Sequence, residues 1–112
     1  MITRTVLAVD LTGPASAIEA YKTHHQRVWP EVVESLRHAG VSRMDIHLLG
    51  RRLVMVLELN DGLDFRHVFA NHLASNSRVQ EWERLMKSLQ EPASDAPPGE
   101  WWAVMEPVFH LS

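Results

Sequence analysis

Two segments in the middle of the chain constrain the fold most strongly. In residues 41–49 (VSRMDIHLL) apolar and polar side chains alternate, and RLVMVLEL at 52–59 follows directly after Gly50-Arg51. Alternation with a period of two is typical of a β-strand, and a short connection containing glycine is typical of a hairpin. We therefore expect these residues to form an antiparallel β-hairpin, against which the rest of the chain packs.

The segments before this hairpin predict one strand and two helices. Residues 2–11 (ITRTVLAVDL) are rich in β-branched and aliphatic side chains, which favours a strand. The S-x-x-E sequence that begins at Ser16 has the form of a capping box, so a helix is expected from there to about Val28. Pro30 suits the first position of a second helix over 30–39, which a glycine then ends.

The segments after the hairpin predict two more helices, a loop and a final strand. Apolar spacing indicates a helix over 63–74, and a second capping box, SRVQ at 77–80, opens an amphipathic helix. Residues 91–100 are polar and proline-rich, which is typical of a loop. We expect 101–111 (WWAVMEPVFHL) to form a strand in which Pro107, having no N–H, lies at an edge or a bulge.

The resulting order, β-α-β-β-α-β, predicts an α+β, ferredoxin-like fold with helices on one face of an antiparallel sheet. The 112 residues suffice for a single domain, 1–112. No segment is left to cover the other face of the sheet, so a second copy of the chain is the expected cover. We therefore predict a homodimer of the dimeric α/β-barrel type, with the last strand a candidate for exchange between copies.

Composition excludes several classes of function. Fourteen acidic and eleven basic residues give a net charge of −3, without the basic block that a nucleic-acid partner requires. The absence of cysteine excludes disulfides and thiolate nucleophiles. The N-terminal apolar run is too short, and too interrupted by Asp10, for a signal peptide or membrane span, so a cytoplasmic location fits. The seven histidines show no H-x3-H or H-E-x2-H spacing, and no metal is expected.

One short segment concentrates aromatic side chains. In YKTHHQRVWPEV (21–32), Tyr21, His25 and Trp29 lie at i, i+4 and i+8. At about 100° per residue, this spacing places all three on one stripe of a helix. Such a stripe packs into a core or lines a polar pocket, and the spacing alone does not choose between the two.

These residues also resemble a known family. The run Y-x3-H-x3-W-P-E at 21–31, the VQEWERLM sequence at 79–86 and the closing V-F-H-L are similar to the L-rhamnose mutarotase family of sugar 1-epimerases. The resemblance covers essentially the full length. It implies a dimeric enzyme that interconverts the α and β anomers of a 6-deoxy-L-sugar, with His25 as proton donor and with Tyr21 and Trp82 as sugar-binding residues.

Two departures from the family pattern bear on the sugar. Rhamnose-type members carry a Trp-Trp pair in the second motif, where this chain has Glu83 after Trp82, and they carry a tyrosine where it has Met44. The W-E version resembles the L-fucose branch. The resemblance therefore implies L-fucose as the monosaccharide substrate, with L-rhamnose as the alternative.

Mutarotation takes a proton from the anomeric hydroxyl and delivers one to the ring oxygen, and it needs no metal or cofactor. Histidine suits this task because both of its forms are populated near neutrality. We expect His25 to be catalytic; Tyr21, Glu83 or a water molecule remain candidates for the second proton carrier. Trp82 and Trp29 are expected either to bind the sugar with Tyr21 and Glu83 or to pack in the core.

The last two tryptophans and two rival functions remain. If Trp101 and Trp102 open a strand, alternation sends their rings to opposite faces, so at most one is expected at the ligand. A small monooxygenase on the same scaffold is one rival function, since the fold alone does not exclude it. A non-catalytic sugar-sensing module is the other.

Overall fold

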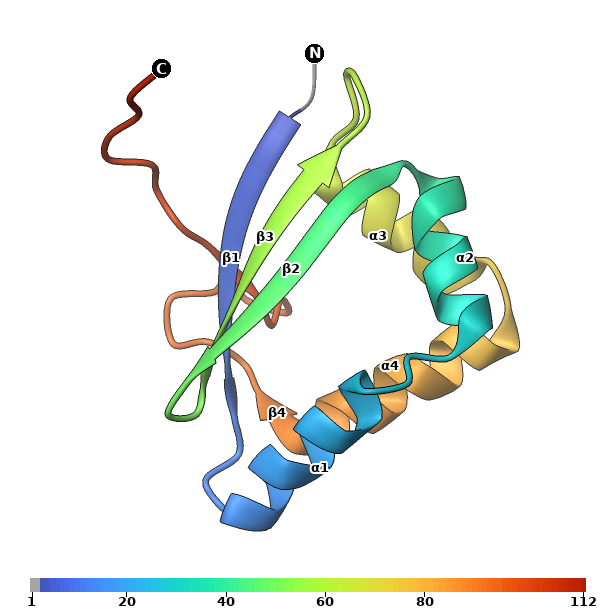
Figure 1. Ribbon diagram of the computed structural model, residues 1–112, viewed down its shortest axis with the longest axis vertical. Coiled ribbons are helices and arrows are strands. Elements are labelled where there is room, and N and C mark those ends of the chain that lie inside the picture. The colour runs from blue at the N-terminus through green and yellow to red at the C-terminus, as the bar shows by residue number, and fades with distance from the viewer. Residues whose placement is uncertain (1–2) are drawn as a thin grey trace.

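The structure, a computed structural model, describes residues 3–112, and the strand position predicted at Ile2 lies outside the described residues. It confirms the central hairpin and the helices around it (Figure 1). The elements are β1 (Thr3–Leu11), α1 (Ala15–His25), α2 (Pro30–Ala39), β2 (Val41–Leu49), β3 (Arg52–Leu59), α3 (Phe65–Ala74), α4 (Ser77–Leu89), β4 (Gln90–Glu91) and β5 (Ala103–Val104).

The sheet is antiparallel and has the strand order β2-β3-β1-β4, with β5 also paired to β1. Within residues 3–112, the four helices lie on one side of the sheet, and the other side carries no helix (Figure 1). This arrangement confirms the predicted α+β, ferredoxin-like fold. The strand alternation sends one set of side chains toward the helices, among them Leu7, Val9, Leu53, Leu57 and Leu59, which are at most 1% exposed.

Both predicted capping boxes are wrong, because each helix begins earlier than the box requires. The first residue of α1 is Ala15, and the carbonyl of Pro14 accepts the first helical bond, from Ala17 N–H at 3.0 Å. In α4 the N-cap is Asn76, whose side-chain oxygen accepts from Val79 N–H at 3.0 Å. Asparagine is among the best N-cap residues, so it takes the position predicted for the serine that follows it.

The helical run around the aromatic segment is also shorter than predicted. Helix α1 ends at His25, not near Val28, and Trp29 is extended (φ −58°, ψ 135°) as the N-cap of α2. The cause is Pro30, whose ring disfavours the helical conformation in the residue before it. Trp29 therefore leaves the stripe that Tyr21 and His25 share.

The predicted final strand is largely absent. Only Ala103–Val104 pairs with β1, and Met105 N–H makes a last bond to the Val6 carbonyl at 2.7 Å. Trp101 and Trp102 form a bend before this strand, and residues 105–112 are irregular. Pro107 cannot donate to a ladder, which is consistent with pairing ending at this point. Figure 1 shows the tail leaving the domain.

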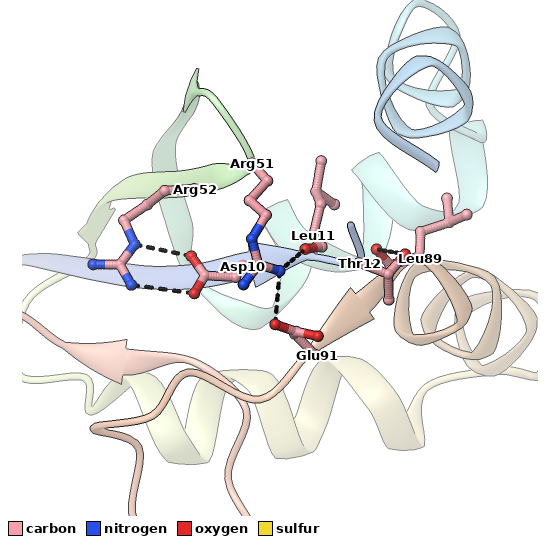
Figure 2. Close-up of polar contacts among 7 residues, drawn as sticks. All are labelled: Asp10, Leu11, Thr12, Arg51, Arg52, Leu89 and Glu91. Atoms are coloured by element: carbon pink, nitrogen blue, oxygen red, sulfur yellow. Dashed lines mark hydrogen bonds and ion pairs between the residues drawn. The ribbon is translucent and has the colours of Figure 1, made fainter. Parts of the chain in front are cut away.

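A polar junction fastens the end of β1 to the strands on both sides of it (Figure 2). The Arg52 guanidinium donates to both oxygens of Asp10, at 2.9 and 3.2 Å, and this pairing lowers the pKa of that carboxyl. Arg51 donates to the Leu11 carbonyl and to Glu91, both at 2.7 Å. These contacts hold β4, and with it the end of α4, against β1.

Gly40 ends α2 in the left-handed region, with φ 114°. A Cβ at this position would collide with the Leu63 side chain, and Asn60 N–H donates to the Gly40 carbonyl at 2.9 Å. The glycine is thus required both by its backbone angle and by the close approach of the loop after β3.

We predict that Gly40→Ala lowers the free energy of unfolding by roughly 1–3 kcal/mol, the cost of a left-handed non-glycine residue. Urea denaturation measures this change. Gly13→Ala is the matched control, because Gly13 has no positive φ and open space around it, so a change within about 0.5 kcal/mol is expected there. Equal losses in the two variants would contradict the argument.

Candidate active site

A cavity of about 1270 Å³ lies between the sheet and the helices. Its walls come from all four helices, from β1, β2 and β3, and from the bend at Trp101 and Trp102. The volume exceeds the usual range for small-molecule sites, roughly 300–1,000 Å³. A monosaccharide therefore fits with room to spare, and the chemistry of the lining decides where in the cavity it binds.

Tyr21 and His25, one helical turn apart on α1, form the polar centre of the cavity wall. Their rings stack with centroids 4.2 Å apart and planes at 24°, and Tyr21 is only 4% exposed. The His25 Nδ1–H donates to the Tyr21 carbonyl oxygen at 2.9 Å. A carbonyl can only accept, so this bond assigns the hydrogen to Nδ1 and leaves Nε2 of the neutral ring as an acceptor.

Nε2 of His25 is open to the cavity. Among the described residues, this atom makes no hydrogen bond, and every buried side-chain nitrogen or oxygen has a hydrogen-bond partner. Nε2 is therefore not buried. Since the ring lines the cavity, the accessible atom is the one that can receive a proton from a bound molecule.

Burial moves the pKa values of these two groups in opposite directions. It lowers the pKa of His25 below 6.5, with the Tyr21 carbonyl opposing the shift and His24 adding to it. It raises the pKa of Tyr21 well above its usual value, with a Gln90 hydrogen bond opposing and the Glu83 carboxylate adding. Both changes disfavour the charged form, so near neutrality the imidazole and the phenol are both uncharged.

Trp82 of α4 closes one side of this pair. Its ring meets the His25 ring edge-on, with centroids 5.4 Å apart and planes at 67°, and it lines the cavity. Trp29 contacts Trp82 at 5.1 Å and 70° but is not among the residues that line the cavity. The structure thus brings Tyr21, His25 and Trp82 together at the cavity and places Trp29 behind them.

Glu83 lines the cavity next to Trp82, and its carboxylate lies 3.6 Å from Lys87. The Lys87 ammonium in turn lies 5.3 Å above the ring of Trp101. Gln90, Lys87 and Met44 line the cavity too, although only Met44 drew attention in the sequence. Lys87 could have been found from its i+4 spacing to Glu83; Gln90 comes from tertiary packing that no local pattern reports.

The premise that Trp101 and Trp102 open a strand is wrong, whereas the prediction that at most one of them meets the ligand stays a prediction. Trp101 and Trp102 both line the cavity, because they lie in a bend and not in a strand that would separate their rings. Within residues 3–112, no three histidine, aspartate or glutamate side chains are grouped so that they could hold a metal ion. No helix in the same range is long and apolar enough to cross a membrane.

Fold and cavity together define a class: a small α+β domain that presents an uncharged histidine–tyrosine pair in an aromatic-walled cavity. Comparison with known proteins makes the class specific. The profile of the L-rhamnose mutarotase family matches residues 4–111. The chain belongs to this family, and it is accordingly an isomerase that interconverts sugar anomers.

Individual relatives agree. A Dictyostelium discoideum protein whose name states no activity is 37% identical over 93% of this chain and 86% of its own. An L-fucose mutarotase of Xanthomonas campestris is 36% identical over 97% of this chain and 88% of its own. The crystal structure of an L-rhamnose mutarotase from Formosa agariphila superposes with a TM-score of 0.69 at 23% identity, over 98% and 99% of the two chains.

We predict that the His25 imidazole titrates below pH 6.5, its ordinary pKa, because burial disfavours the imidazolium. Neutral His25 then stabilises the fold above pH 6.5, and this contribution is lost as the pH falls from 6.5 through the folded pKa. ¹⁵N NMR of the imidazole measures both the titration and the tautomer, with urea-unfolded protein as the reference. A folded pKa at or above the unfolded one would contradict the prediction.

Proposed function

We propose that this chain interconverts the α and β anomers of L-fucose. The observation that carries the proposal is an accessible His25 Nε2 beside the uncharged Tyr21 phenol, in a cavity large enough for a sugar. Support for L-fucose comes from Glu83 and Met44, which stand where rhamnose-type members carry tryptophan and tyrosine, and from the relative named L-fucose mutarotase. L-rhamnose is the alternative, since the family profile and the Formosa agariphila structure carry that name.

His25 acts first as a base. Its Nε2 takes the proton of the anomeric hydroxyl, the C1–O1 bond becomes a carbonyl, and the bond from C1 to the ring oxygen breaks. The electron pair of that bond goes to the ring oxygen, which takes a proton from Tyr21 or a water molecule and gives it back when the ring closes. The imidazolium formed in this step has a lowered pKa and is therefore a ready proton donor when the ring closes on the other face. The family resemblance implies that His25 is a proton donor. In this mechanism His25 takes that role only after its neutral ring has accepted a proton.

Tyr21 serves the ring oxygen. Its raised pKa keeps the phenol protonated, so it is a hydrogen-bond donor to the oxygen on which negative charge develops as the ring opens. Glu83 offers a hydrogen-bond acceptor where Tyr21 offers a donor. Beside Lys87 its carboxylate is an acceptor for a sugar hydroxyl, a role that the indole of a rhamnose-type member does not offer.

The tryptophans shape the wall. Trp82 offers the C–H face of a pyranose a broad apolar surface beside His25, and Trp101 and Trp102 enclose the cavity from the final bend. Trp29 contributes through Trp82, since it does not line the cavity itself.

Saturation-transfer NMR on equilibrated L-fucose, L-rhamnose and a D-sugar tests the function. We expect wild-type protein to accelerate exchange between the anomers of L-fucose more than that of L-rhamnose. His25→Asn should lower the rate by about 10²–10⁴-fold, the usual contribution of a positioned acid or base. His38→Asn, on the exposed side of α2, is the matched control and should retain the wild-type rate.

Two results would contradict the proposal. Equal rates for His25→Asn and wild type would remove the histidine from the mechanism, and acceleration of L-rhamnose alone would replace the substrate. Binding of L-fucose without faster exchange would favour the sugar-sensing alternative.

We also propose that the chain works as a homodimer joined through the uncovered face of the sheet. The side chains that point to this face at the centre of β1 and β3 are small and apolar: Val6, Ala8, Val54 and Val56. Ion pairs flank them, Arg4 with Glu58 at 3.0 Å at one end and Arg52 with Asp10 at 2.9 Å at the other. An apolar centre with both charges at each end suits a second copy related by a two-fold axis.

The tail supports the same arrangement. Val108, Phe109 and Leu111 are 93%, 81% and 82% exposed, a run of large apolar side chains that this chain leaves uncovered. A partner sheet edge or face would bury them. One structure with a TM-score of 0.51 is described as a dimeric ferredoxin-like protein, which supports a dimer for folds of this kind.

Light scattering at micromolar concentration is expected to give twice the chain mass of 12.8 kDa. Val56→Lys places a charge at the centre of the proposed interface and should yield monomers. Thr23→Lys, on the exposed side of α1, adds the same charge elsewhere and should leave the dimer intact. A wild-type monomer at that concentration would overturn the proposal.

A further inference from the structure

Arg78, in the first turn of α4, is held against Trp29. The central carbon of its guanidinium lies 3.8 Å from the centroid of the Trp29 ring. The same guanidinium lies 3.4 Å from a Glu31 oxygen and 3.0 Å from a Glu81 oxygen. Exposed ion pairs of this kind contribute little stability on their own. Their consequence here is geometric, because two carboxylates fix the guanidinium over one ring.

This contact is the outer end of a row of rings that leads to the catalytic pair. Trp29 meets Trp82 edge-on at 5.1 Å, Trp82 meets His25 edge-on at 5.4 Å, and His25 stacks on Tyr21 at 4.2 Å. Within the described residues, Trp29 makes no aromatic contact other than that with Trp82. The Trp29 ring therefore contacts the Arg78 guanidinium on one side and Trp82, in the wall of the active site, on the other.

The motif W-P-E supplies both parts of the Arg78 contact. Pro30 holds Trp29 extended at the start of α2, and Glu31 then lies in the first turn of that helix. The ring and the carboxylate thus come from neighbouring residues and meet one guanidinium that comes from α4. Only arginine can stack its plane on an indole while pairing with two carboxylates; a lysine ammonium is a point charge without a plane.

We propose that Arg78 is a positioning residue for His25, acting through Trp29 and Trp82. The inference rests on the proposed function for its kinetic consequence, though its geometric consequence is independent of any substrate. With Arg78 in place, Trp82 keeps the His25 ring desolvated and aimed at the sugar. Without it, Trp29 loses its outer support, Trp82 gains freedom, and water reaches the imidazole.

The experiment compares Arg78→Met, Arg78→Lys and the control Arg84→Met. Arg84 is exposed on the same helix and does not line the cavity, and within residues 3–112 its side chain makes no hydrogen bond or ion pair. We expect Arg78→Met to lower kcat for anomer exchange by about 10-fold to 100-fold, the scale of a misplaced catalytic group, with a smaller change in KM. Arg78→Lys should recover only part of this loss, and Arg84→Met should behave as wild type.

The second readout is the pKa of the His25 imidazole, followed by ¹⁵N NMR. Burial holds it below 6.5, so a loosened wall should raise it toward 6.5 in Arg78→Met and leave it unchanged in Arg84→Met. This readout separates positioning from a general loss of stability. If the wild-type chain accelerates the exchange of no sugar tested, the proposed function fails. The His25 pKa in Arg78→Met then still tests whether Arg78 positions His25.

An unchanged His25 pKa together with an unchanged kcat in Arg78→Met would overturn the inference. Equal effects in Arg78→Met and Arg84→Met would do so too. Should Arg78→Met not fold, Glu31→Gln removes one of the two anchors, and it should shift the His25 pKa and kcat in the same directions by smaller amounts. A Glu31→Gln variant identical to wild type in both measurements would then overturn it.

Discussion

The structure depends on the restriction that Pro30 places on the residue before it. A single long helix from residue 15 to 39 would carry Trp29 down the same stripe as Tyr21 and His25. The proline instead holds Trp29 extended, so α1 ends at His25 and α2 begins in a new direction. The break turns the indole toward α4, where it meets Trp82 and Arg78, and it leaves His25 in the last turn of α1, at the wall of the cavity.

Local patterns predicted the fold because each of its elements is locally consistent. The hairpin follows from period-two alternation around Gly50, and Pro30 and Gly40 mark the start and end of α2. The final strand could not be predicted in this way. Its aliphatic run at 101–111 has strand character, but pairing depends on what β1 still offers, and β4 already occupies part of that edge.

The sequence predicted the part of the site that helical spacing and the family resemblance determine, and not the part that depends on tertiary packing. Tyr21 and His25 are four residues apart on one helix, so their stacking follows from helical geometry, and Trp82 was reached through a resemblance. Gln90 and the pair Trp101 and Trp102 required knowledge of how the end of α4 and the last bend fold over the sheet. The role of Arg78 was hidden for another reason. A charged residue at a helix start is ordinarily solvated, and only the position of Trp29 gives it a ring to cover.

In the proposed mechanism, burial gives the site its acid and its base at once. Opening a hemiacetal needs one group that can accept a proton and one that can donate a hydrogen bond, both at the same pH. In water an imidazole near pH 6.5 is half charged, and a charged ring could not begin as the acceptor. The cavity wall removes that charge and also keeps Tyr21 protonated, because desolvation penalises imidazolium and phenolate alike.

A wall of tryptophans achieves this without adding a charge of its own, and Glu83 and Lys87 bring their opposite charges into the cavity as a pair. The aromatic enclosure therefore sets the protonation states of His25 and Tyr21, and in the proposed mechanism it also shapes the space around the sugar.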